Sequence, residues 1–192
     1  MFLPSDQLER SALRQGDVVG PIHIVGAIDL LTIQYTQNVE GTRGTGWTIP
    51  TKAEFQNAMI LSHSCEMDIS NGVKVTSFIL APIRDASAAT NPALIEQLRS
   101  SNLINENTGA SFLKYFYLEP RAEFADENMN VSEIGYCVDF SKCFSVRKGC
   151  HGHLLQKKKL QMAPDITQAM ATKLALYFYR RQVPNQAIAL PA

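Results

Sequence analysis

The segment richest in reactive side chains runs from residue 62 to residue 68, Ser-His-Ser-Cys-Glu-Met-Asp, directly after a short apolar run. His63 and Cys65 are two residues apart, and on an extended chain such side chains project to the same face. They could form a thiolate–imidazolium pair with Cys65 as nucleophile, or ligate one metal ion. The competing interpretation makes Cys65 a small buried hydrophobe and Asp68 a turn residue.

A second group of cysteines and histidines lies at residues 143–153 and comprises Cys143, Cys150, His151 and His153. Structural zinc sites use these residue types, usually as two closely spaced pairs, and that spacing is missing here. Four ligands would require a composite site that combines this group with His63 and Cys65, from a distant segment. We therefore expect no metal and no other cofactor, and free thiols at all four cysteines.

Basic residues are concentrated in the last part of the chain. Residues 1–140 hold nine Lys or Arg and 17 Asp or Glu, whereas residues 141–192 hold nine Lys or Arg and one acid. Cations attract phosphate and aromatic rings stack on bases, which favours a nucleic-acid partner. The candidate nucleic-acid-binding residues are Arg147, Lys148, Lys157, Lys158, Lys159, Arg180 and Arg181. The alternative is that the two oppositely charged parts fold against each other.

Hydrophobic periodicity predicts the elements that position these residues. Residues 6–15 indicate a short helix or turn that ends at Gly16, and the glycine-containing segment 37–52 is typical of a surface loop. Apolar and β-branched runs predict strands at residues 18–28, 31–37, 58–61, 78–81, 112–118, 135–140 and 143–146, the first two as a hairpin.

Two helices are expected in addition. One lies at residues 92–104, capped by Asn91, and forms an insertion between strands. The other spans about residues 165–182, and its apolar face is expected to be core. That face consists of Ile166, Met170, Leu174, Tyr177 and Phe178.

These elements predict one domain of mixed α+β class over residues 1–192. Its β core would span about residues 16–84 and 112–148, with an inserted helical segment at about residues 85–111. The sequence shows no secretory leader and no run of about 18 apolar residues. We therefore expect a cytoplasmic protein without membrane contact.

Two sequence blocks resemble the PemK/MazF family of toxins. The first is Gly16-Asp17-Val18-Val19, and the second is the pair of strands at residues 58–62 and 78–83, which ends in Ala-Pro-Ile. The resemblance covers about residues 16–84. It implies a small half-open β-barrel of the Src-homology-3 type with a C-terminal helix, metal-independent cleavage of single-stranded RNA, an antitoxin partner and a homodimer.

The family's catalytic arginine, part of an Arg-Pro pair before its second conserved strand, is absent, because the stretch at residues 55–58 reads Phe-Gln-Asn-Ala. We expect other arginines to stabilise phosphate charge, two hydroxyls that match the family's Ser/Thr position to hold the phosphate, and His63 to transfer protons. The candidate catalytic residues are Arg43, His63, Cys65, Thr76, Ser77 and Arg84.

Two other functions remain open from the sequence. A non-catalytic barrel could bind another protein, as a regulatory subunit or as the sensor of a stress or phage-defence operon. The missing Arg-Pro pair and the insertion at residues 85–111 favour it. The second is a cysteine-dependent or zinc-containing enzyme centred on Cys65. Function depends on the site, so fold resemblance alone does not choose among them.

Overall fold

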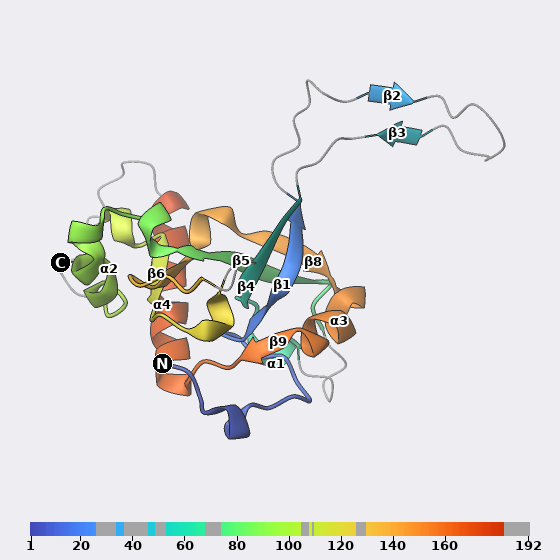
Figure 1. Ribbon diagram of the computed structural model, residues 1–192. Helices are drawn as coiled ribbons and strands as arrows, with labels where there is room; N and C mark the ends of the chain where they lie inside the picture. The colour runs from blue at the N-terminus through green and yellow to red at the C-terminus, as the bar shows by residue number, and fades with distance from the viewer. Residues whose placement is uncertain are drawn as a thin grey trace, which may run out of the picture.

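The computed structural model describes residues 1–25, 34–36, 46–48, 53–67, 74–104, 108, 110–125 and 130–182. Within these residues the fold is mixed α+β, as the sequence predicts. A seven-stranded antiparallel sheet has the order β6-β7-β5-β4-β1-β9, and β8 pairs with β5 outside that path. Helices pack on both faces of this sheet (Figure 1).

The strands of the sheet are β1 (Val18–Val25), β4 (Ala53–Ile60), β5 (Ser77–Asp85), β6 (Tyr115–Leu118), β7 (Tyr136–Asp139), β8 (Phe144–Arg147) and β9 (Lys158–Leu160). A separate two-stranded sheet consists of β2 (Gln34–Thr36) and β3 (Gly46–Thr48). The helices are α1 (Ser64–Met67), α2 (Ile95–Ser100), α3 (His151–Gln156) and α4 (Pro164–Gln182).

The predicted hairpin between residues 18–28 and 31–37 is wrong. β1 pairs instead with β4, where Val18 is opposite Met59, and with β9, while β2 pairs with β3. Val18 and Val19 are fully buried in different clusters, so β1 is an internal strand with a neighbour on each side. Local β propensity identifies such a strand but does not identify its partners.

The helix or turn expected at residues 6–15 is reduced to one 3-10 turn, Ser5–Gln7. Farther along, the Gln15 N–H donates to Ser64 Oγ at 3.0 Å, so the chain is held by a distant segment in place of helical hydrogen bonds. Gly16 does end the segment as predicted. Its φ of 85° lies in the left-handed region that favours glycine.

The two ends of the sheet are not joined. Among the residues that the structure describes, β6 and β9 are the end strands and no pairing connects them, so the sheet is not closed into a barrel. At the β6 end, Asn102 Nδ2 donates to Tyr117 O and the Tyr117 N–H donates to Asn102 Oδ1, both at 2.8 Å. This amide replaces a further strand and satisfies backbone groups that an open edge would expose.

Side chains of β5 alternate between two hydrophobic clusters. Ala81 and Ile83 belong to the larger cluster, and Phe78 and Leu80 belong to the other. Because successive residues of a strand point to opposite faces, the clusters lie on opposite faces of the sheet. α4 covers the first, whereas α1 and α3 cover the second.

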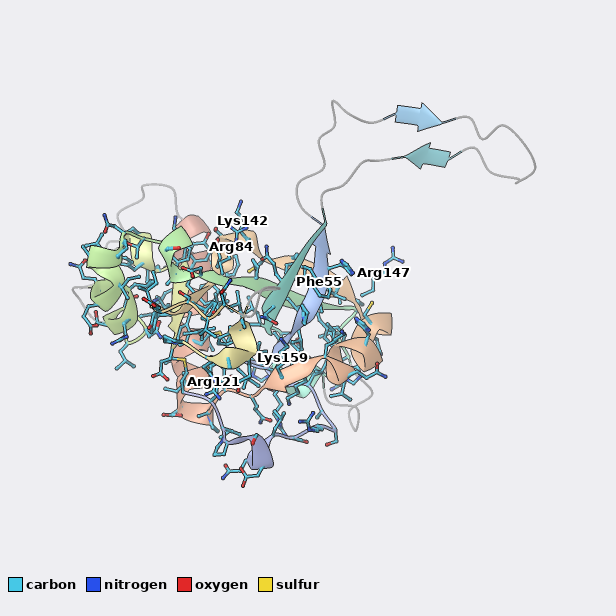
Figure 2. The ribbon with its side chains drawn as sticks, viewed as in Figure 1. Phe55, Arg84, Arg121, Lys142, Arg147 and Lys159 are labelled. Atoms are coloured by element: carbon cyan, nitrogen blue, oxygen red, sulfur yellow. The ribbon has the colours of Figure 1, made fainter. Side chains whose placement is uncertain are left out.

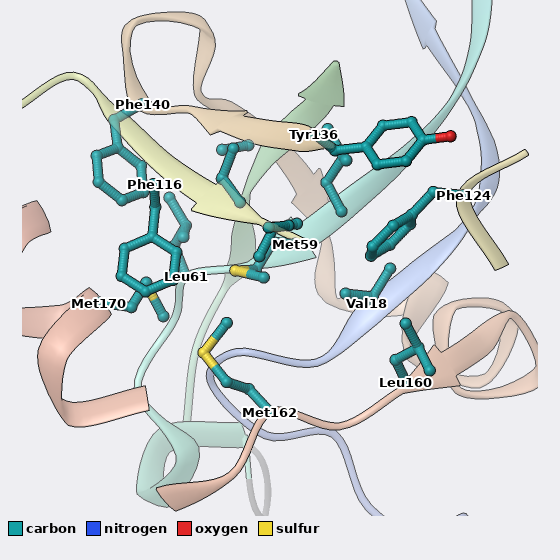
Figure 3. Close-up of a cluster of buried hydrophobic side chains, with 14 residues drawn as sticks. Val18, Met59, Leu61, Phe116, Phe124, Tyr136, Phe140, Leu160, Met162 and Met170 are labelled. Atoms are coloured by element: carbon teal, nitrogen blue, oxygen red, sulfur yellow. The ribbon is translucent and has the colours of Figure 1, made fainter. Parts of the chain in front are cut away.

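The predicted C-terminal helix is confirmed as α4. Met170 has no exposed surface and lies beside Phe116 in the larger cluster (Figure 3). Leu174 and Tyr177 pack against the same cluster, whereas Phe178 is 40% exposed. Each fully buried apolar side chain of this size stabilises the fold by about 1.5–3 kcal/mol, so the apolar face of α4 is mainly core.

Lys158 of β9 and Asp17, which directly precedes β1, form a buried ion pair. Lys158 Nζ lies 2.7 Å from Asp17 Oδ2, and the two side chains are 1% and 0% exposed. The same carboxylate oxygen accepts the Arg14 N–H at 2.6 Å, and Lys158 Nζ also donates to Ala12 O at 3.0 Å. Burial raises the pKa of Asp17 to about 6, although Lys158 and Arg14 oppose the shift. At neutral pH the Asp17 carboxyl is therefore mostly ionised. Because Lys158 is buried against it, the prediction that Lys158 binds nucleic acid is wrong.

Removing one partner of this pair should strongly destabilise the protein. Lys158→Ala leaves the Asp17 carboxylate buried without its cation, which should lower the free energy of unfolding by about 3–5 kcal/mol. Urea denaturation near neutral pH measures the change. The exposed Lys142 provides the matched control, since Lys142→Ala should stay within about 0.5 kcal/mol of the parent. Equal stability of Lys158→Ala and the parent would contradict the pair's structural role.

A second lysine, Lys173, is buried in α4, and no carboxylate among the residues that the structure describes pairs with it. Its side chain has no exposed surface, and its Nζ donates to Ser101 Oγ at 2.7 Å and lies 5.9 Å from the centre of the Phe116 ring. Desolvation lowers the pKa of Lys173 from 10.5 to about 7. The amine therefore links α4 to the end of α2 largely as a neutral group at slightly alkaline pH.

Protein stability should rise with pH above neutrality because of Lys173. Between pH 7 and 10.5 the unfolded chain binds a proton at this amine that the folded chain does not. Raising the pH therefore disfavours unfolding, by up to about 1.4 kcal/mol per pH unit. Urea denaturation between about pH 7.5 and 8.5 measures this slope.

The variant Lys173→Met removes the titrating amine and should abolish that increase, while Lys142→Met should retain it. The chosen pH range stays below 9.0, the ordinary thiol pKa, above which Cys137 and Cys143 also contribute. Identical slopes in the parent and in Lys173→Met would show that the buried amine does not release its proton on folding.

Candidate functional site

Three strands end side by side at one end of the sheet. The Leu61 N–H donates to Ile79 O and the Ile79 N–H donates to Ser62 Oγ, both at 2.8 Å, which joins the end of β4 to the start of β5. On the other edge of β5, Ser77 is opposite Arg147 of β8. The segment that carries His63 therefore lies near the first residues of β5 and the last residues of β8.

One face of this strand end is not covered by the core. Phe78 and Leu80 are fully buried on the other face, but Ile79 is 48% exposed. The residues that share its face are Ser77, Ile79, Ser145 and Arg147, which form two directly opposed pairs across β5 and β8 and are called the open strand face below. Arg147 projects into solvent at the edge of the molecule (Figure 2).

His63 and Cys65 lie in the turn that follows β4. The two exposed side chains are in contact, with 2.9 Å between His63 Nδ1 and Cys65 Sγ. The predicted placement of both residues on one side is confirmed, while the interpretation of Cys65 as a buried hydrophobe is wrong. The geometry is that of a helix start instead of an extended chain, because α1 begins at Ser64.

Contacts on both sides hold this turn in place. Ser62 Oγ accepts a hydrogen bond from β5, and Ser64 Oγ accepts one from Gln15 of the N-terminal segment. Met67, at the end of α1, is fully buried. The imidazole is thus presented by an anchored turn. Nδ1 faces the thiol, so Nε2 is the nitrogen left for a ligand, and it can take a proton in the tautomer whose Nδ1–H donates to Cys65 Sγ.

The structure brings four other predicted residues to the same strand end. Thr76 directly precedes β5, and Ser77 is its first residue and is opposite Arg147. The Lys148 N–H donates to Thr76 O at 3.0 Å, so Lys148 is adjacent as well. Of these groups, the Ser77 hydroxyl and the Arg147 guanidinium share the open strand face, and this combination can hold a phosphate group.

Arg84 is not brought to this site. It lies seven residues beyond Ser77 on β5, a distance of about 23 Å along an extended strand. Its partner in the β5–β7 register is Cys137. Figure 2 accordingly shows Arg84 and Arg147 far apart. The other predicted arginine, Arg43, lies outside the described residues.

The run of three lysines does not form a phosphate-binding surface. It reads as a basic patch in the sequence, but two of its residues belong to β9, which pairs with β1 and directs Lys158 into the core. Lys159 Nζ donates to Glu123 O at 3.1 Å, and desolvation lowers the pKa of Lys159. Lys157 is half-buried. Arg180 and Arg181 belong to the last turn of α4.

The cysteines and histidines before and after β8 are dispersed. Burial raises the pKa of Cys143 to about 11 and that of Cys137 to about 12. His151 packs its ring against Phe78, with 5.8 Å between ring centres, whereas Cys150 is exposed. Among the described residues, no three His, Cys, Asp or Glu side chains are grouped so that they could hold a metal ion.

Sequence reasoning missed Ile79 and Ser145 as parts of the site. The signal was present in residues 144–147, where Phe-Ser-Val-Arg alternates between apolar and polar and so predicts a half-buried strand with Ser145 and Arg147 on one face. The exposure of Ile79 had no such signal, because it depends on where α4 stops covering the sheet.

The part of the chain described by the structure includes no helix with the length and apolarity needed to cross a membrane. Neither a protein-family model nor a curated protein matches this sequence.

Proposed function

We propose that this protein acts on single-stranded RNA at the open strand face and cleaves it without a metal ion, as a divergent relative of the PemK/MazF toxins. The observation that carries the proposal is the opposed pair of Ser77 and Arg147 beside the turn of His63 and Cys65. A cation and a hydroxyl for the phosphate, together with an imidazole for the proton, are the groups that such cleavage needs.

In the proposed reaction, the Arg147 guanidinium binds the scissile phosphate and Ser77 donates a hydrogen bond to it. His63 takes the proton of the RNA 2′-hydroxyl, whose oxygen then attacks phosphorus while the bond to the 5′ oxygen breaks. The proton passes from His63 to that leaving oxygen, and a 2′,3′-cyclic phosphate remains. Cys65 Sγ acts through His63 by accepting the Nδ1–H, which leaves the Nε2 lone pair to take the proton and makes Cys65 a positioning residue for this step.

The proposal extends to the fold type and the partners. β1, β4, β5 and β8 would be the strands of a half-open barrel, with α4 as the family's C-terminal helix. An antitoxin from the same operon would cover the open strand face, the protein would form a homodimer, and its location would be the cytoplasm. The antiparallel order of β1, β4 and β5 and the packing of α4 on one face support this assignment.

The purified chain should cleave single-stranded RNA in the presence of a chelator. Arg147→Ala should lower the cleavage rate by about 10²–10³-fold, because it removes a group that stabilises charge in the transition state. His63→Ala should lower it by about 10²–10⁴-fold. Lys142→Ala, at an exposed cation far from the strand end, is the matched control and should change it little. Cleavage that is unchanged in both site variants would contradict the proposed site.

A second candidate function is that of a non-catalytic module that binds an operon-encoded regulatory protein. It is favoured by an exposed pair of rings on the ribbon of β1 and β4, where His23 is opposite Phe55 with 4.8 Å between ring centres. Phe55 is 42% exposed. If the parent chain neither binds nor cleaves RNA at low salt, and Phe55→Ala abolishes binding to the protein encoded next to it, this function replaces the first.

A further inference from the structure

We propose that Cys65 and His63 form a modification site at which hydrogen peroxide or a similar peroxide oxidises Cys65 to sulfenic acid. The reaction needs a thiol open to solvent and a base in contact with it. Both conditions are met here, because the two side chains are exposed and Cys65 Sγ lies 2.9 Å from His63 Nδ1.

The other thiols of the chain provide an internal comparison. Cys137 is buried on β7, and Cys143 is half-buried with its Sγ 3.1 Å from Phe140 O. Burial raises the pKa of both thiols, which disfavours their reactive thiolate forms. Cys150 is exposed like Cys65. Reactivity that depends on exposure alone would affect Cys65 and Cys150 equally, whereas reactivity assisted by a base favours Cys65.

The contact of thiol and imidazole is held by the fold. Ser62 and Ser64, on either side of His63, each accept a backbone hydrogen bond, from β5 and from Gln15 respectively. The Cys65 N–H also points to His63 Nδ1 at 3.4 Å. The imidazole therefore stays beside the sulfur without further reorganisation, as a positioned base must.

In the proposed step, the tautomer of His63 that carries its hydrogen on Nε2 takes the thiol proton at Nδ1 as the sulfur attacks one peroxide oxygen. An S–O bond forms, the O–O bond breaks, and the leaving hydroxide takes the proton from His63 to give water. Thiol and hydrogen peroxide thus become sulfenic acid and water, with sulfur oxidised and peroxide reduced. A thiol reductant restores Cys65 through a mixed disulfide.

Oxidation also changes the neighbouring base. The sulfenic acid places an oxygen on the sulfur that had held Nδ1, so the ring loses the contact that orients it. This consequence rests on the proposed function, since it predicts that peroxide stops RNA cleavage and that dithiothreitol restores it. The oxidation itself does not depend on RNA.

The test is treatment of the folded protein with hydrogen peroxide and dimedone, which labels sulfenic acid, followed by mass spectrometry of the cysteine peptides. Cys65 should be labelled at least about tenfold faster than Cys150, a conservative figure for assistance by a positioned base. His63→Ala should reduce the rate at Cys65 to that at Cys150. His153→Ala, at an exposed histidine of α3, is the matched control and should leave both rates unchanged.

Equal labelling of Cys65 and Cys150, or a rate at Cys65 that His63→Ala does not change, would overturn the proposal. Thermal melting of each variant, and continued protection of Cys137 from label, establish that the variants are folded. RNA cleavage is measured separately on the same samples. Fast labelling without RNA cleavage supports the thiol site and refutes the RNA function. RNA cleavage with slow labelling supports the RNA function and overturns the thiol site.

Discussion

The buried ion pair of Asp17 and Lys158 connects the core of the molecule to its candidate site. It fastens β9 to the start of β1, and the same carboxylate binds the Arg14 backbone and so fixes the turn before β1. Gln15, the next residue of that turn, hydrogen-bonds to both Leu61 O and Ser64 Oγ. The position of the His63 turn is therefore determined through one continuous set of contacts that begins at a desolvated charge pair.

The site occurs where the two-sided burial of the sheet ends. In the middle of β5, α4 covers one face, and α1 and α3 pack on the other, so side chains on both faces are core. Toward the start of β5 only one face stays covered, and the other exposes Ile79 and its neighbours. Hydrophobic burial on the covered face anchors this strand end, and the open strand face remains accessible. The side chains of the open strand face are therefore held at fixed spacing without being covered.

The basic residues that cause the charge asymmetry have two different environments in the structure. Part of the basic excess is used inside the molecule, since Lys158 pairs with Asp17, Lys159 binds a backbone carbonyl and Lys173 is buried beside Ser101. Another part, represented by Arg147 and Lys148, remains exposed beside the hydroxyls that open β5. The alternative in which the oppositely charged parts fold against each other is thus realised at Lys158, whereas a nucleic-acid partner for the exposed cations stays part of the proposal.

The sequence by itself determined the α+β class, the amphipathic C-terminal helix and the grouping of His63 with Cys65, because these follow from periodicity and spacing within short segments. It also identified Ser77 and Arg147 as candidate site residues, but it did not predict that they are opposite each other. Only the tertiary structure decided the partners of β1, the burial of Lys158 and Lys173, and the separation of Arg84 from Ser77. Those properties depend on which distant segments pair across the sheet and which faces the helices cover. Local propensity is insensitive to both, since a strand or a lysine has the same local sequence signal whether distant segments leave it exposed or bury it.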